Sequence, residues 1–177
     1  MAQQERSMRR FWIPTLAAIA AIVASTSGAL AVDKASQKFM TEAMQGNLAE
    51  IAVGKLAQQK GQSDGVRSFG QMLVSDHSAN NEKAMSVAQS MGVSPPSEPS
   101  KKQQSVYDRL AKLSGENFDR EFAKAMVEDH KNDIGEFEKQ AKKKNDPAAD
   151  FANETLPTLR KHLEKAQSLA SGKSASR

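Results

Sequence analysis

Apolar residues recur every three or four positions through four long segments of this 177-residue chain, and this spacing constrains the fold more than any other feature. Such a period places the apolar side chains on one face of an α-helix, whereas a half-buried strand alternates every second residue. The chain is also rich in Ala, Met, Lys, Gln and Glu and poor in β-branched clusters, which favours helices. We therefore expect an all-α protein.

Turn and capping residues divide the chain after residue 32 into these segments. The residues that mark helix ends are Gly61, Ser63, Gly92, Ser114 and the pair Asp146-Pro147. The predicted helices span about 36–60, 63–91, 115–143 and 147–170. Pro157 lies inside the last of them and should kink or break it, because proline lacks the backbone N–H that the helix needs.

The links between the helices predict how the helices are connected. The first two helices and the last two are joined by short turns. The link between the second and third is long and rich in proline ("GVSPPSEPSKK"), and it contains a short helix at 105–113. Two helical hairpins with a long crossover are typical of a ferritin-like four-helix bundle. We predict this fold for residues 32–170, followed by a flexible tail at 171–177.

Residues 1–31 have the three parts of a secretory signal peptide. Arg9 and Arg10 precede fourteen apolar or small residues, "FWIPTLAAIAAIVA", and an A-x-A cleavage site ends at Ala31. Fourteen residues are fewer than the roughly 20 that span a bilayer, which favours cleavage over a retained anchor. We therefore expect a bacterial protein of the periplasm or outside the cell, associated with the envelope or free, with no integral membrane span after cleavage.

The charge of the mature chain excludes some partners. Removal of Arg6, Arg9, Arg10 and Glu5 lowers the net charge from +4 to +2, so the mature chain is nearly neutral. The basic run at 142–144 sits at a predicted helix end, where cations complement the helix dipole. With few aromatic residues and no nucleic-acid motif, we expect no nucleic-acid partner. The chain has no cysteine, which excludes disulfides, Fe–S clusters and thiol catalysis.

Two Asp-His pairs stand at matching places in the second and third long helices. The motif F-x3-[L/M]-x2-D-H-x2-[N/D] describes both "FGQMLVSDHSAN" and "FAKAMVEDHKND". At about 100° per residue, its polar members share the sector of the apolar stripe. The last helix has a histidine on its core side as well. The inward-facing polar residues are Asp76, His77, Asn80, Asp129, His130, Asp133 and His162.

One interpretation of these residues is structural. An unpaired buried polar group costs a few kcal/mol, so each of them needs a partner. Asp76 and Asp129 would accept hydrogen bonds from histidines on neighbouring helices, with the reciprocal pairs Asp76–His130 and Asp129–His77 as one arrangement. Such a layer would fix helix register, with buried water completing the network. The supporting residues would be Asn80 and Asp133.

The other interpretation is a metal site. Imidazoles and carboxylates are the ligands that divalent metals such as Zn, Mn, Fe or Cu take in proteins. The candidate ligands are His77, His130, His162, Asp76 and Asp129. No cofactor is assured by the sequence, and both interpretations stay open.

Several residues oppose a di-iron oxygenase or ferroxidase. The di-iron signature of helical bundles has a Glu three residues before a His, but here Val74, Val127 and Leu159 stand at those places. On the first helix, Glu50 is expected to face water and Glu42 to lie at the boundary of the core. A mononuclear site remains open, since two His and one carboxylate suffice for one metal.

Other catalytic motifs are missing from the sequence. It lacks a Gly-rich phosphate loop, a G-x-S-x-G elbow and an H-E-x-x-H helix. Neighbours on a helix point about 100° apart, so an adjacent Asp-His pair is not by itself a catalytic dyad. Ser75 and Ser78 flank the first pair, but Glu128 and Lys131 stand at those places beside the second. We therefore expect no enzymatic activity.

Four segments resemble a known bacterial family: "GNLAEIAVGKLAQQK", "FGQMLVSDH", "GENFDREFAKAMVEDH" and "LPTLRKHLEKA". The family is catalogued as domain of unknown function 4142, and its members are exported helical proteins that are often labelled outer membrane proteins. The resemblance runs over about residues 39–170. It implies a ferritin-like bundle behind a signal peptide and no settled activity. The family's motifs map onto Asp76-His77, Asp129-His130 and Leu156 to Leu163.

The sequence as a whole favours an exported periplasmic or envelope-associated helical bundle that is non-catalytic and has a structural His/Asp layer in its core. A second hypothesis is a periplasmic metal-binding or metal-dependent redox protein that uses the same His/Asp cluster. A third is an interaction module that binds a protein or envelope partner through an outer helical face. The sequence does not identify such a partner.

Overall fold

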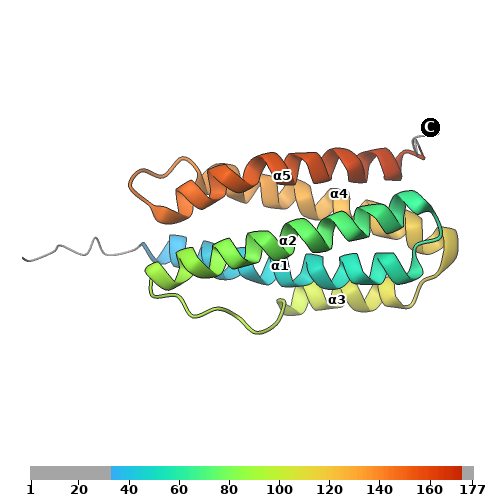
Figure 1. The fold of residues 1–177 in the computed structure, drawn as a ribbon, viewed down its shortest axis with the longest axis horizontal. Helices are drawn as coiled ribbons and strands as arrows, with labels where there is room; N and C mark the ends of the chain where they lie inside the picture. The colour runs from blue at the N-terminus through green and yellow to red at the C-terminus, as the bar shows by residue number, and fades with distance from the viewer. Residues whose placement is uncertain (1–32, 173–177) are drawn as a thin grey trace, which may run out of the picture. The chain divides into compact units, whose positions relative to one another are not determined.

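The computed structural model describes residues 33–172, and five helices make up most of this range (Figure 1). They are α1 (Lys34–Lys60), α2 (Asp64–Ser90), α3 (Lys101–Ala111), α4 (Gly115–Gln140) and α5 (Pro147–Ala170). No strand occurs within residues 33–172, so the predicted all-α class is confirmed. The predicted signal peptide and the end of the predicted tail lie outside the described residues. Among residues 33–172, no helix is both long and apolar enough to cross a membrane.

The helices form two hairpins, as predicted. α1 pairs with α2, α4 pairs with α5, and the two hairpins pack against each other (Figure 1). The connection after α2 leads to α3, which packs along the outside of α1 and also contacts α4. α3 begins at Lys101, before the predicted start at residue 105, because Ser100 and Gln103 form a capping box there.

Most of the predicted helix ends have the expected cap geometry. The side chains of Ser63 and Asp146 each accept a backbone N–H from the first turn of the helix that follows. Ser114 stands at the predicted N-cap of α4, but its side chain makes no cap hydrogen bond. α5 continues unbroken through Pro157, because this residue is exposed and water can satisfy the carbonyl that loses its helical partner.

Polar contacts fasten both ends of the bundle. Gln140 Nε2 donates to Ser36 Oγ at 3.0 Å, and Lys143 Nζ donates to Asp33 Oδ2 at 2.8 Å. Because Lys143 turns back toward α1 in this way, α4 ends at Gln140 and not at the predicted residue 143. At the other end, the carboxylate of Asp119 accepts two backbone N–H groups of the α1–α2 turn, each at 2.8 Å.

α1 and α2 approach each other closely where Gly54 faces Gly70. A Cβ atom on Gly54 would lie 2.7 Å from the carbonyl oxygen of Gly70, and a Cβ on Gly70 would lie 2.6 Å from that of Gly54. Real Cβ atoms do not come this close to a carbonyl oxygen, so both positions require glycine. This contact of two backbones fixes how α1 sits against α2.

A layer of polar residues divides the apolar core into two clusters. One cluster includes Met40, Met44, Phe137 and Phe151. The other includes Phe69, Leu73, Phe118, Phe122 and Met126. The buried polar residues of the layer between them are Asn47, Glu50, His77, His130, Thr155 and His162. The layer crosses the middle of the long helices, at the height where the sequence placed the Asp-His pairs.

α1 is rotated relative to its predicted orientation. The apolar residues that recur every three or four positions on the first helix include Leu48 and Ile51, and this spacing predicts that they face inward and that Glu50 faces water. In the structure Leu48 and Ile51 are half-buried, whereas Asn47 and Glu50 are each only 3% exposed. α1 contacts all of the other described helices, so α3 and α4 cover a face that would be exposed in a bundle without α3. The prediction that Glu50 faces water is therefore wrong.

Candidate metal centre

Three histidines from three helices meet in the polar layer. His77 comes from α2, His130 from α4 and His162 from α5, and all three are buried. One ring nitrogen of each lies within 4.8 Å of a ring nitrogen of each of the others. The ring centroids are 5.3 to 6.0 Å apart. The structure thus brings together all three histidines that the sequence pointed to.

A backbone carbonyl determines which nitrogen of His130 carries hydrogen. Nδ1 lies 3.0 Å from the carbonyl oxygen of Met126, one turn earlier on α4. A carbonyl oxygen can only accept, so Nδ1 is the donor. Burial lowers the pKa of His130 to about 4. The ring is therefore neutral at pH 7, and its Nε2 keeps a lone pair.

The carboxylate of Asp76 determines which nitrogen of His162 carries hydrogen. Nε2 of His162 lies 2.9 Å from Asp76 Oδ2, so Nε2 donates to the carboxylate and Nδ1 keeps the lone pair. Burial lowers the pKa of His162 below its ordinary value, although the hydrogen bond to Asp76 opposes the shift. Nδ1 of His162 is 3.3 Å from Nε2 of His130. With both rings neutral, neither of these two nitrogens has a hydrogen to give.

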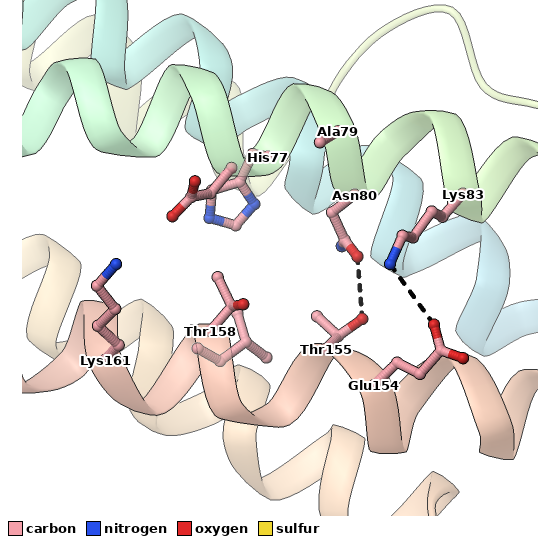
Figure 2. A pocket seen from close by; sticks show the side chains of 10 residues that line it. His77, Ala79, Asn80, Lys83, Glu154, Thr155, Thr158 and Lys161 are labelled. Atoms are coloured by element: carbon pink, nitrogen blue, oxygen red, sulfur yellow. Dashed lines mark hydrogen bonds and ion pairs between the residues drawn. The ribbon is translucent and has the colours of Figure 1, made fainter.

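An amide on α1 orients His77. Nδ1 of His77 lies 2.9 Å from Asn47 Oδ1, and the same oxygen accepts from Asn80 Nδ2 at 3.1 Å. In this network Nδ1 of His77 donates, and its buried Nε2 has no hydrogen-bond partner among residues 33–172. Burial, reinforced by the neighbouring imidazoles, lowers the pKa of His77 well below its ordinary value. Figure 2 shows Asn80 in turn bonded to Thr155 of α5, with 2.9 Å between Oδ1 and Oγ1.

Each ring therefore gives its one hydrogen to an acceptor at the periphery and keeps one lone pair free. Metal-binding histidines are held in this way, with the second ring nitrogen donating to a carbonyl or a carboxylate. Around a tetrahedral zinc ion with bonds of about 2.0–2.1 Å, ligand nitrogens lie about 3.3 Å apart. The separation of His130 Nε2 and His162 Nδ1 is 3.3 Å. The arrangement fits a transition-metal ion.

Asp76 accepts from a histidine on a neighbouring helix, as the structural interpretation expected, but the reciprocal arrangement of Asp-His pairs is not formed. Asp76 bonds His162 and not His130, and His77 bonds Asn47 and not Asp129. Adjacent residues on a helix point about 100° apart, so a helix that turns His130 into the centre turns Asp129 toward a different neighbour. Asp76 therefore orients a candidate ligand by its hydrogen bond.

The neighbour of Asp129 is Glu50 of α1. A carboxylate oxygen from each lies within 4.8 Å of the other and of a ring nitrogen of His130. Glu50 is 3% exposed, and its Oε2 has no hydrogen-bond partner among the described residues. Burial, followed by the charge of Asp129, raises the pKa of Glu50 well above its ordinary value. Burial and the same charge raise the pKa of Asp133 to about 8.

Sequence reasoning missed Asn47, Glu50 and Thr155. Asn47 and Glu50 continue the spacing of three residues that begins at buried Met44, and this spacing was the available signal. The apolar neighbours Leu48 and Ile51 indicated a different inner face of the helix, and this indication was followed instead. Of the predicted supporting residues, Asn80 belongs to the hydrogen-bond network of His77, whereas Asp133 lies half-buried on the side of Asp129.

Two cavities reach His77. One of about 310 Å³ lies between α2 and α5, and Figure 2 shows His77 and Asn80 facing Thr158 and Lys161 across it. A second of about 550 Å³ is lined by residues of every described helix, and these include Asn47, His77, Asp129 and Asp133. His77 lines both cavities, so an ion or a small molecule can approach this ring from solvent.

Comparisons with known proteins agree with the fold. A family model described as Domain of unknown function (DUF4142) matches residues 21–169. No curated protein gives a significant match to the chain. The chain is similar to a solved structure described as a DUF305 fragment from Deinococcus radiodurans, with a TM-score of 0.70 and 13% sequence identity. The match covers 80% of this chain and 98% of that chain, and at this identity it shows a likeness of fold alone.

Proposed function

The chain belongs to the family described as Domain of unknown function (DUF4142), and we propose that it is an exported metal-binding protein whose three buried histidines hold one transition-metal ion. The family description assigns no activity, so the proposal is built on the site. One observation carries it: three neutral imidazoles have given their hydrogens to outer acceptors, and one nitrogen of each lies within 4.8 Å of the others.

The ligand set narrows the choice of metal. Imidazole suits Zn²⁺, Cu²⁺, Fe²⁺ and Ni²⁺, and the chain has no cysteine thiolate to favour a softer ion. Three histidines leave at least one position for water or a small ligand, as in catalytic zinc sites. The cavity of about 310 Å³ beside His77 gives such a ligand room. These features support reversible binding of an ion and of a small molecule on it.

The other residues of the layer have defined parts in this proposal. The carbonyl of Met126, the carboxylate of Asp76 and the amide of Asn47 each hold one histidine by its N–H group. They fix which nitrogen of each ring keeps a lone pair, and they orient the rings before an ion arrives. Such outer partners also raise the basicity of the ligands.

Export is part of the proposal. Residues 1–31 have the order of basic, apolar and small residues found in a signal peptide, and this supports a periplasmic or secreted location. In such a compartment a protein without cysteine keeps its ligand set whatever the redox conditions. The test is to locate the processed chain by cell fractionation and to read its first residues by N-terminal sequencing, which should begin at Val32.

Elemental analysis tests the metal site. The protein is expressed from the full sequence and purified without chelator, and we expect about one transition-metal ion per chain. His77→Gln and His130→Gln should lose the ion and remain helical by circular dichroism. The matched control is Glu82→Gln, an exposed position on α2. The proposal is overturned by wild-type protein that stays unloaded after incubation with Zn²⁺, Cu²⁺, Fe²⁺ and Mn²⁺.

Co²⁺ gives a second readout. A Co²⁺ ion bound by three imidazoles absorbs visible light much more strongly than aqueous Co²⁺, and this absorption should disappear in His77→Gln. A purely structural His layer predicts a different result. In that case His77→Gln lowers the thermal stability, and added metal changes neither the absorption nor the stability of the wild type.

A further inference from the structure

The acidic group beside His130 has no part in the three-histidine centre. Glu50 and Asp129 hold two carboxylates within 4.8 Å of each other, at the level of the polar layer. Oε2 of Glu50 is buried without a hydrogen-bond partner among residues 33–172. Two carboxylates in a buried place repel each other unless a proton or a cation lies between them. Without a metal a proton takes this place, because burial, the charge of Asp129 and a hydrogen bond to it raise the pKa of Glu50; a divalent cation would displace that proton.

His130 lies close to the other two histidines and to the two carboxylates, but it can be a metal ligand in only one of these groups. Its Nδ1 hydrogen is bonded to the carbonyl of Met126, so Nε2 offers the ring's one lone pair. Nε2 is also the atom that lies 3.3 Å from His162 Nδ1. Its lone pair therefore belongs to the three-histidine centre, and the carboxylates of Glu50 and Asp129 are left without a nitrogen ligand.

The carboxylates also lie outside the coordination sphere of an ion held by the histidines. Ligand atoms around one ion with bonds of about 2.0–2.1 Å are at most about 4.2 Å apart. One ligand atom of each of the three histidines lies within 4.8 Å of those of the other two, and the same holds for Glu50, Asp129 and His130. The five residues do not form one set within that distance. The three histidines and the two carboxylates therefore mark two neighbouring ion positions.

We propose that Glu50 and Asp129 bind a second divalent cation, one that prefers oxygen ligands, such as Mn²⁺ or Mg²⁺, beside the three-histidine centre. The proposal rests on the proposed function, because that centre takes the lone pair of His130. One or two carboxylates with several waters are a usual ligand set for such cations. Asp133 is half-buried one turn after Asp129 and belongs to the same acidic group.

The surroundings leave room for a hydrated ion. A cavity of about 220 Å³ beside α3 is lined by Glu50 and Asp129, and a water molecule occupies about 30 Å³ in the liquid. Gln103 of α3 also lines it, but its amide oxygen already accepts from the backbone N–H and the hydroxyl of Ser100. Two cationic side chains, Lys102 and Arg109, also line this cavity. Both residues are exposed, so their charged ends can extend into water.

The test keeps the two sites apart by using two metals. Protein loaded with one equivalent of Zn²⁺ is titrated with Mn²⁺, and free Mn²⁺ is followed by its electron paramagnetic resonance signal. We expect the wild type to take up one further Mn²⁺ per chain. Glu50→Gln and Asp129→Asn should lose that uptake and keep their Zn²⁺. Glu82→Gln, which makes the same change on an exposed surface, should keep both metals.

The outcomes distinguish the two proposals. Mn²⁺ uptake that is absent from the Zn²⁺-loaded wild type, or unchanged in Glu50→Gln, overturns the second site and leaves the first intact. Zn²⁺ binding that is absent, or unchanged in His77→Gln, overturns the proposed function. Circular dichroism and thermal unfolding show that each variant is folded before its metal content is compared.

Discussion

Nε2 of His130 lies 3.3 Å from Nδ1 of His162, and while both rings are neutral neither nitrogen carries a hydrogen. The hydrogens are held on the far sides of the rings, by the carbonyl of Met126 and the carboxylate of Asp76. Two lone pairs at this distance repel each other, and a cation between them removes the repulsion. The stability of the core therefore depends on whether a cation is bound between these two nitrogens.

Removing the metal should therefore destabilise the protein. A ligand that binds only the folded state at about 100 times its dissociation constant adds about 2.7 kcal/mol to the free energy of unfolding. We expect urea unfolding of wild-type protein to shift to lower denaturant when a chelator replaces Zn²⁺. His77→Gln should unfold at the same denaturant concentration with Zn²⁺ and with chelator. Coincident curves for the wild type would contradict the prediction.

Asp76→Ala should weaken metal binding without removing a ligand. The carboxylate holds Nε2–H of His162, and loss of such an outer partner typically lowers metal affinity by about 10- to 100-fold. Competition with a chromogenic chelator measures the change. Glu82→Ala removes an exposed carboxylate from the same helix and should leave the affinity unchanged. An Asp76→Ala protein with wild-type affinity would show that the hydrogen bond has no such role.

The metal-free protein should lose stability in mild acid. The pKa of His130 in the fold is about 4, below the value of about 6.5 for an exposed histidine. The unfolded chain therefore takes up the proton first. Stability is fully present above pH 6.5 and is lost as the pH falls towards 4, by about 3 kcal/mol for this group. Urea unfolding in chelator at pH 7 and pH 4.5 measures the loss, and His130→Gln should reduce it.

Glu50→Gln should stabilise the metal-free protein at neutral pH. The folded state raises the pKa of Glu50, so the unfolded chain releases its proton first and wild-type stability falls as the pH rises above about 4.5. Glutamine has no such proton, and its amide can donate to the carboxylate of Asp129. We expect a gain on the order of 1 kcal/mol that is larger at pH 8 than at pH 5. A loss at both pH values would count against repulsion between the carboxyl groups.

Two glycine substitutions should have opposite effects. Gly70→Ala places a Cβ 2.6 Å from the carbonyl oxygen of Gly54 and must push α1 and α2 apart, at a cost of about 1–3 kcal/mol. Gly135 is exposed on α4 with nothing near its Cβ position. Gly135→Ala should therefore add about 0.5–1 kcal/mol through helix propensity. Thermal unfolding measures both, and equal effects would argue against the close helix contact.

Local patterns in the sequence were sufficient to predict most of the helices and the position of the polar layer along them. Caps such as Ser63 and Asp146 act within one turn, so their neighbours in sequence reveal them. The start of α3 and the end of α4 were misplaced. At the end of α4, the geometry depends on contacts of Gln140 and Lys143 with the distant start of α1.

The sequence by itself determined that the chain is helical, where its hairpins turn, and that His77, His130 and His162 face inward, because these follow from a period of 3.6 residues and from short-range caps. The tertiary structure decided the burial of Glu50 and the partner of each ring nitrogen. Both depend on how far each helix is rotated and shifted against the others. Contacts such as that between Gly54 and Gly70 set this rotation and shift, and their partners lie far apart in the chain.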